Sequence, residues 1–229
     1  MRGLRVLLWV MLGIVLLFLS VLLVFRWVPV PTSAFIYHQN ALHAAEPAIY
    51  KAANFEWTDW DNIPPELALA VLTAEDQRFP THWGIDTIEL RNVYDDWRAG
   101  KAVRGASTIT QQLAKNLFLW NGRSYVRKMV EIVLSVSMEL VWSKQRILEV
   151  YLNVAQFADV TFGVKASSKL LFDKEPMELT REECAMLAAV LPTPAKSNAN
   201  EPSETLQKRH AWILKHMDKL GGVDYLKKL

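Results

Sequence analysis

The amino-acid sequence predicts a mainly α-helical protein that is held to a membrane by one N-terminal transmembrane helix. An uncharged, apolar run extends from Val6 to Phe25, near the start of the chain. After Pro65, apolar residues recur at helical spacing, and strand-like alternation is scarce. Pairs of polar residues with the spacing of capping boxes stand at the starts of several of these segments. Together these observations favour a helical domain behind a membrane anchor.

The apolar run is long enough to cross a membrane, because a helix needs about 20 residues to span the hydrocarbon core of a bilayer. A cleaved signal peptide is the alternative, but its apolar region is usually only about 7–15 residues long. Arg2 and Arg5 precede the run and Arg26 follows it. The positive-inside rule then places the N-terminus in the cytoplasm and the rest of the chain outside. We expect residues 1–27 to form the cytoplasmic tip and the anchor.

Residues 28–64 predict a linker and an irregular lead-in, because they contain the segment VPVPTS and end at Pro64. The remaining residues, 65–229, are enough for one domain with a sizeable core. The helices expected in this domain are ELALAVLTAED, DTIELRNVYDDW, TITQQLAKNLF, residues 125–142, RILEVYLNVAQF and TREECAMLAAVL. The pairs spaced as capping boxes are Asp86 with Glu89, Thr108 with Gln111, and Thr180 with Glu183.

Composition and charge exclude several classes of protein. Apolar residues make up 51% of the chain and charged residues 22%, which is too hydrophobic for a disordered protein. Three basic residues and no acidic ones lie in the first 30 positions, so the body of the chain is nearly neutral. A nucleic-acid partner is not expected, since such binders carry a basic excess in the folded part. Cys184 is the only cysteine and lies in an apolar run, which predicts burial without a disulfide.

Glu75 is a candidate catalytic residue because of its place in the chain. The segment from Leu67 to Leu72 is apolar on all sides, so this helix is expected to be buried, and it leads directly into Glu75 and Asp76. The helix terminus, the neighbouring carboxylate and burial would all disfavour ionisation, as suits a general base. The alternative is an exposed acidic pair on a turn, and the segment by itself leaves both open.

A second candidate site lies in the segment GASTITQQLAKN. Small residues lead into the start of a helix there, and free backbone amides at such a start can bind an anion. Gln111 and Lys115 are four residues apart and share a face, which would extend the site with an amide and an ammonium group. Simple capping by Thr108 and Gln111 explains the helix start but leaves Lys115 without a role.

The predicted helix over residues 125–142 carries one narrow polar stripe among apolar residues, made of Arg127, Glu131, Ser135 and Glu139. The stripe faces either water or a cleft. The approach RSYVRKMVE favours a cleft, because it brings basic side chains near one carboxylate and guanidinium groups suit contact with phosphate. The later segment SKQRILEVYLN is interpreted as scaffolding with a polar contact from Glu149.

The sequence contains no HExxH, CxxC, GxGxxG or Walker-type pattern, so it predicts no metal site and no nucleotide site held by the protein. His82 is a lone histidine, and we interpret it as structural.

Five blocks in their order along the chain resemble the peptidoglycan glycosyltransferases, specifically the monofunctional biosynthetic transglycosylases. They are EDQRFPTHWG, RGASTITQQLAKN, RKMVE, KQRILEVYLN and REECAMLAAVLPTP. The resemblance implies that residues 65–229 form a lysozyme-like, mostly α glycosyltransferase domain with a smaller membrane-associated lobe. No penicillin-binding transpeptidase domain is expected after it.

The resemblance also implies the reaction and the roles of individual residues. The expected enzyme elongates glycan chains from lipid II, a disaccharide-peptide on undecaprenyl pyrophosphate, by an inverting transfer that releases undecaprenyl pyrophosphate. Glu75 would deprotonate the 4-hydroxyl of the acceptor, and Glu131 would be the second catalytic acidic residue, near the donor. The residues expected to handle the donor and its pyrophosphate are Ser107, Gln111, Lys115, Arg123 and Arg127. This would give the anion features found above a common ligand.

The expected partners are lipid II, the growing glycan chain, membrane lipid and other proteins of cell-wall synthesis. No cofactor is required, although a divalent cation such as Mg²⁺ could assist at the pyrophosphate. The expected location is the bacterial cytoplasmic (inner) membrane, with one span and the catalytic domain on the outer side. Two departures from the family pattern are Gly105-Ala106 in place of two glycines and the absence of glycines around Ala158.

Two rival functions remain at this point. A lysozyme-like peptidoglycan hydrolase would also use a glutamate in a cleft, but it has no pyrophosphate for Lys115 and Arg123 to bind. A non-catalytic membrane-tethered scaffold of the cell-wall machinery would not need the acidic residues.

Overall fold

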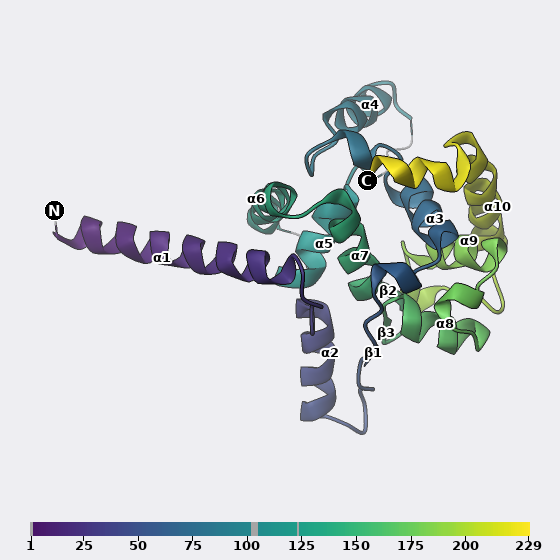
Figure 1. Cartoon of the computed structure of the whole chain (residues 1–229), viewed down its shortest axis with the longest axis horizontal. Coiled ribbons are helices and arrows are strands. Elements are labelled where there is room, and N and C mark those ends of the chain that lie inside the picture. Colours follow the sequence, from purple (N-terminus) through teal and green to yellow (C-terminus); the bar gives the residue numbers. More distant parts are fainter. Residues whose placement is uncertain (1, 102–104, 123) are drawn as a thin grey trace.

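The structure is a computed structural model that describes residues 2–101, 105–122 and 124–229. The mainly α class predicted from the sequence is confirmed, with one long helix, α1, projecting alone from a body built of the other helices (Figure 1). The helices are α1 (Arg2–Phe25), α2 (Ala34–Ala45), α3 (Pro65–Glu75), α4 (Thr87–Arg98), α5 (Ile109–Phe118), α6 (Tyr125–Val141), α7 (Lys144–Val154), α8 (Val164–Phe172), α9 (Arg181–Val190) and α10 (Glu204–Lys219). The strands are β1 (Asn54–Phe55), β2 (Gln156–Ala158) and β3 (Thr161–Phe162), and a 3-10 segment, η5 (Gly222–Lys228), ends the chain.

The helices expected after residue 65 are present, and polar side chains cap three of their starts as expected. Asp86, Thr108 and Thr180 each accept a hydrogen bond from a backbone N–H of the first turn. The full capping box forms at Thr180 with Glu183. The side chain of Gln111 does not close such a box, because its Oε1 accepts a hydrogen bond from a side chain on α6 instead.

Several elements were not expected from the sequence. The segment 28–64, predicted as a linker and irregular lead-in, contains α2 and the strand β1. β1 pairs in parallel with β3, and β3 pairs antiparallel with β2, so a small sheet forms in the order β1-β3-β2. The expected helix RILEVYLNVAQF ends at Val154, where the chain passes into this sheet. The domain limits themselves stay predictions.

The core lies around α3, as its apolar sequence predicts. All residues from Leu67 to Thr73 are buried. The helix contacts α9, α10 and η5, so three elements from the C-terminal half of the chain enclose it. Cys184 on α9 belongs to this core, and burial raises the pKa of its thiol to about 12. The thiol is therefore protonated at neutral pH, and it behaves as a small hydrophobic side chain.

The helix α1 has the length and composition of a membrane span and is tied to the body at its C-terminal end. Its span from Gly3 to Phe25 has a mean hydropathy of 3.0, and it is the only helix among the described residues with this character. The indole Nε1 of Trp142 donates to the carbonyl of Leu22 at 2.7 Å. The guanidinium of Arg146 donates to the carbonyl of Phe25 at 3.0 Å. Side chains of the body thus satisfy carbonyls that the end of a helix leaves unpaired.

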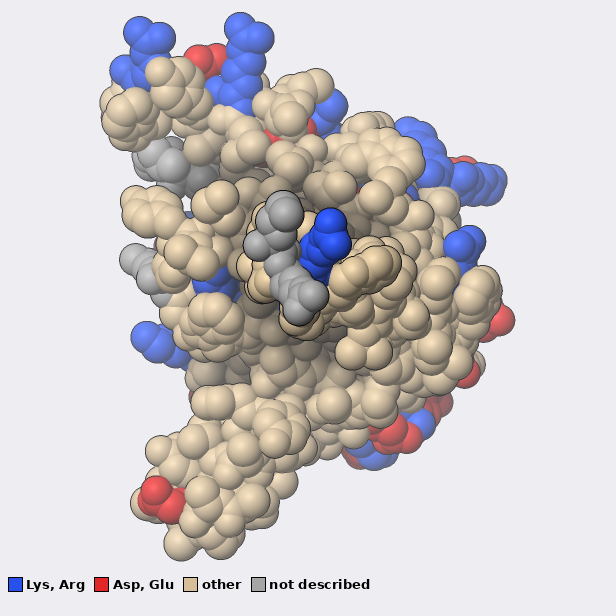
Figure 2. Space-filling model, turned by 90° about the vertical axis from the view of Figure 1, so that its left-hand side faces the viewer, with Lys and Arg blue, Asp and Glu red and all other residues tan. Residues whose placement is uncertain are grey.

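The helix α6 is amphipathic in an inverted sense: its polar side faces the protein and its apolar side faces outward. Arg127, Glu131, Ser135 and Glu139, the polar stripe of this helix, are all buried. Apolar side chains on the other side are exposed, including Met129 at 69%. Figure 1 places α6 beside the base of α1. The face from which α1 projects is mostly uncharged, with Lys and Arg mainly toward its edge (Figure 2). Exposed apolar side chains gathered on one side of a helix are typical of a surface that contacts a membrane or another protein.

Candidate functional site

Glu75 is the last residue of α3, and its carboxylate is held by two donors from other helices. Oε2 accepts a hydrogen bond from Nε2 of Gln112 on α5 at 2.8 Å. Oε1 accepts one from Nη2 of Arg209 on α10, also at 2.8 Å. The side chain of Glu75 is 13% exposed and Asp76 is buried. The alternative of an exposed acidic pair on a turn is therefore wrong.

Burial raises the pKa of Glu75 above its usual value. The hydrogen bond from Gln112 and the charge of Arg209 act in the opposite direction, while the neighbouring Asp76 adds to the rise. This rise in the pKa of Glu75 was expected from the sequence, since desolvation and a nearby like charge both disfavour the carboxylate. A raised pKa makes the carboxylate a stronger base, and the two fixed donors hold it in place to take a proton from a hydroxyl group.

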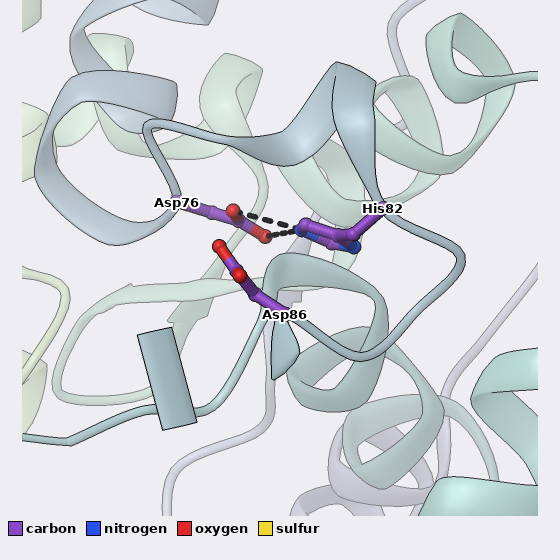
Figure 3. A group of neighbouring side chains, drawn as sticks. All are labelled: Asp76, His82 and Asp86. Atoms are coloured by element: carbon purple, nitrogen blue, oxygen red, sulfur yellow. Dashed lines mark hydrogen bonds and ion pairs between the residues drawn. The ribbon is translucent and has the colours of Figure 1, made fainter. Parts of the chain in front are cut away.

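The turn that follows Glu75 is held by a buried network around Asp76 (Figure 3). Nε2 of His82 lies 3.0 Å from Oδ1 and 3.1 Å from Oδ2 of Asp76. Oδ2 also accepts the backbone N–H of Ile109, the first residue of α5, at 3.0 Å. Asp76 therefore ties the end of α3 to the start of α5, which places Gln112 beside Glu75. The contact of His82 with Asp76 supports its interpretation as a structural residue.

Asp76, His82 and Asp86 form a group whose composition could hold a metal ion, with ligand atoms within 4.8 Å of one another. Figure 3 shows the two carboxylates side by side. Their oxygens are, however, already engaged. Oδ1 of Asp86 accepts the backbone N–H groups of Ile88 and Glu89, and Oδ2 lies 3.1 Å from Nε of Arg78. The group fits a hydrogen-bonded turn better than a cation site.

A second polar group lies between α5 and α6, around Glu131. One carboxylate oxygen of Glu131 accepts from Nη1 of Arg127 at 2.6 Å, and the other is paired with Nζ of Lys128. The same Nζ donates to Oγ of Ser107 and to Oε1 of Gln111, each at 3.1 Å. The structure thus brings four of the predicted site residues together, with Lys128 at their centre. It also decides that the polar stripe of α6 faces α5 and not water.

Lys115 lies near this second group but has no carboxylate bound to it. Its Nζ sits 5.4 Å from the ring centroid of Phe35, and no hydrogen bond or ion pair to it is found within the described part of the chain. Burial lowers the pKa of Lys115, with the charges of Arg127 and Lys128 acting in the same direction and Glu131 against it. An unpaired, half-buried ammonium beside other cations is suited to an anionic ligand. The predicted site residue Arg123 lies outside the described residues.

The helix α5 joins the two groups, because consecutive residues on it face different ones. Gln111 contacts Lys128 of the second group, whereas Gln112 contacts Glu75. Gln111 was predicted from the sequence to be a site residue, whereas Gln112 was not, although both stand in the same segment. Arg209 was missed, and no local signal marks it in the helix that carries it.

The chain is similar over most of its length to known proteins. The profile of the family described as Transglycosylase matches residues 40–218. A biosynthetic peptidoglycan transglycosylase of Mannheimia succiniciproducens is 45% identical over 205 residues, which cover 90% of this chain and 84% of the relative. Proteins of the same name from Yersinia pestis and Yersinia pseudotuberculosis are 43% identical over 215 residues, 93% of this chain and 89% of each relative. Because the profile covers most of the chain and the similarity extends over nearly the full length of these relatives, the chain belongs to the transglycosylase family, as its sequence blocks predicted.

Proposed function

We propose that this protein elongates peptidoglycan glycan chains from lipid II and that Glu75 is its catalytic base. In the proposed step the carboxylate of Glu75 takes the proton of the acceptor's 4-hydroxyl. The hydroxyl oxygen forms a bond to the anomeric carbon of the donor as the bond from that carbon to the pyrophosphate oxygen breaks. The electron pair leaves with undecaprenyl pyrophosphate, and the configuration at the anomeric carbon is inverted.

The setting of Glu75 supports this role more than any other single observation. The carboxylate lies at the end of a buried helix, with one donor from α5 and one from α10. Each oxygen accepts one hydrogen bond, so lone pairs remain for an incoming hydroxyl group. Two fixed donors also limit the rotation of the side chain, and a positioned base is more effective than a mobile one.

The cations between α5 and α6 support a pyrophosphate site. The leaving group develops negative charge as its bond to the sugar breaks, so cations held nearby lower the barrier. Lys115 is the most direct candidate, because its ammonium has no bound carboxylate among the described residues. Both oxygens of Glu131 are occupied by Arg127 and Lys128. We therefore assign Glu131 a positioning role for these two cations. Arg123 is included in the proposed pyrophosphate site on the family resemblance alone. Ser107 and Gln111 are included as polar contacts to the donor.

A divalent cation such as Mg²⁺ would be held in this proposal by the oxygens of the substrate's pyrophosphate. The one group of described residues with suitable composition, around Asp76, is engaged in hydrogen bonds. No step of the proposed reaction is assigned to a metal ligand of the protein.

We also propose that the protein lies in the bacterial cytoplasmic membrane with one span and the catalytic domain outside. Support comes from α1, from the basic residues before it, and from the exposed apolar side of α6. With α6 lying against the lipid, the polar stripe and the cations would face the region just above the membrane, where a lipid-linked donor presents its pyrophosphate. Other proteins of cell-wall synthesis are further expected partners.

The test uses the purified full-length chain in detergent with labelled lipid II, and the products are separated by size. Wild type is expected to form long glycan, and Glu75→Gln is expected to form none. Glu201→Gln is the matched control, because it makes the same chemical change at an exposed residue that belongs to neither polar group of the site. Normal polymerisation by Glu75→Gln would show that Glu75 is not the base.

The same assay separates the rival functions. Degradation of preformed glycan without polymer formation would support a hydrolase, and wild-type protein that binds lipid II without turnover would support a scaffold. The cations near Lys115 disfavour the hydrolase, which has no pyrophosphate in its substrate.

A further inference from the structure

A buried tyrosine stands behind Glu75 and reaches it through a glutamine. The hydroxyl group of Tyr151, on α7, donates to Oε1 of Gln112 at 2.9 Å. Nε2 of the same amide donates to Oε2 of Glu75 at 2.8 Å. Tyr151 is 1% exposed, so its hydroxyl group is shielded from bulk solvent. Three helices, α7, α5 and α3, thus contribute one residue each to a directed row of hydrogen bonds that ends on the carboxylate.

The direction of this row is set at Tyr151. Burial, together with the nearby Glu75 carboxylate, raises the pKa of Tyr151 well above its usual value, so its hydroxyl keeps its proton. A buried hydroxyl that donates to nothing carries a free-energy penalty, and Oε1 of Gln112 is the acceptor it has in this structure. The two ends of an amide differ, one being an acceptor and the other a double donor. With Oε1 turned to Tyr151, the amino group must face Glu75.

The orientation of Gln112 distinguishes the two protonation states of Glu75. An amino group that faces the side chain stabilises the carboxylate, because it can only donate. A protonated Glu75 would be stabilised more by a Gln112 amide turned the other way, because the amide oxygen could then accept a hydrogen bond from the protonated carboxyl group. The flip would turn the amino group toward Tyr151 and leave the tyrosine's own proton without an acceptor. Tyr151 therefore disfavours the arrangement that a protonated Glu75 prefers.

We propose that Tyr151 is a positioning residue of this enzyme, which acts through Gln112 to orient Glu75 and keep it ionised as the base. This inference rests on the proposed role of Glu75. Two charged groups also face Glu75: Arg209 favours the carboxylate and Asp76 opposes it, and burial opposes it as well. Like Arg209, Tyr151 and Gln112 stabilise the ionised form of Glu75. Their contribution depends on the direction of the hydrogen bonds and not on net charge.

The experiment is the pH dependence of lipid II polymerisation at saturating substrate for wild type and Tyr151→Phe. The base works as a carboxylate, so the rate rises with pH through the pKa of Glu75. This rising part of the pH–rate profile is its acid limb. In Tyr151→Phe the acid limb should move to higher pH by about 0.5–1 unit, which is the shift that loss of one hydrogen bond of ordinary net strength produces. The rate deficit should be largest on the acid limb and shrink as pH rises.

Two further variants separate this role from simple packing. Tyr225→Phe is the matched control, because it removes the hydroxyl of another buried tyrosine, which donates to the backbone carbonyl of Gln77 at 2.7 Å. It should leave the acid limb in place. Gln112→Ala should shift the limb upward, and adding Tyr151→Phe to it should shift the limb no further, because Tyr151 acts through this amide.

A rate loss in Tyr151→Phe that is equal at every pH would overturn the inference and leave Tyr151 a packing residue. Additive shifts in the double variant would also overturn it. Failure of the base assignment has a different signature: Glu75→Gln would then polymerise normally. If Glu75→Gln is inactive while the limb of Tyr151→Phe stays in place, the role of Tyr151 alone is refuted.

Discussion

Replacement of Glu131 by alanine should destabilise the protein strongly, although the residue lies on a helix with an exposed apolar side. The side chain of Glu131 is 4% exposed and pairs with two cations. Alanine would remove the negative charge and leave both cations in place. Arg127 is the more affected of the two, because its side chain is 11% exposed, whereas that of Lys128 is 37% exposed.

The structure allows an estimate of the loss. Removing one partner of a buried ion pair typically costs about 3–5 kcal/mol. Arg127 would keep its hydrogen bond to the carbonyl of Gly122, and Lys128 would keep those to Ser107 and Gln111. We therefore expect the lower end, about 3 kcal/mol, which lowers the Tm by about 6–12 °C in a chain of this size. Glu131→Gln keeps an acceptor for Arg127 and should lose less, about 1–2 kcal/mol.

Thermal unfolding in detergent, followed by tryptophan fluorescence, measures these changes. Asp224→Ala is the matched control, since it also removes a carboxylate paired with a lysine three residues away, but both side chains are exposed. It should leave the Tm unchanged. If Glu131→Ala unfolds within 2 °C of wild type, the buried pairing on α6 does not stabilise the fold and the inward direction of its polar stripe has to be reconsidered.

Three further changes test other parts of the structure. Lys115→Ala should lower the rate of lipid II polymerisation at least tenfold, through weaker handling of the pyrophosphate, without a change in Tm; an unchanged rate would remove that role. Gly163→Ala should lower the Tm by more than Gly221→Ala, although both glycines have a positive φ. A Cβ at Gly163 would lie 2.4 Å from a backbone carbonyl oxygen of α7, while a Cβ at Gly221 would meet nothing within 4 Å. Equal losses of Tm would contradict this. Trp142→Phe should speed proteolysis at the junction of α1 and the body, because it removes the hydrogen bond to the last turns of α1; cleavage at the wild-type rate would show that this bond does not hold the junction.

Much of the fold could be predicted because its signals are local. The apolar run of α1, the all-apolar sequence of α3 and the capping residue Thr180 each act within a few positions of the chain. The strands were not predicted, since they have two or three residues each and owe their pairing to segments far apart: Asn54 lies opposite Thr161. Such short strands carry no periodicity that a sequence can show.

The candidate site was predictable only in part. The sequence blocks pointed to Glu75 and to the polar residues at the start of α5. In the structure these residues belong to two polar groups, one around Glu75 and one around Glu131, and α5 joins the two groups. The hydrogen-bond partners of Glu75 could not be predicted. Arg209 lies 134 positions away, and Gln112 differs from Gln111 only by the direction in which it points.

By itself, the sequence determined the long apolar helix at the N-terminus, the buried helix that ends at Glu75 and the existence of a polar stripe on α6, because periodicity and capping act along one helix. Only the tertiary structure decided which way that stripe faces and which donors meet Glu75. Periodicity shows that a helix has two sides, but the neighbours on each side come from distant parts of the chain. Here those neighbours turn the polar side of α6 inward and bring Arg209 and Gln112 to the carboxylate.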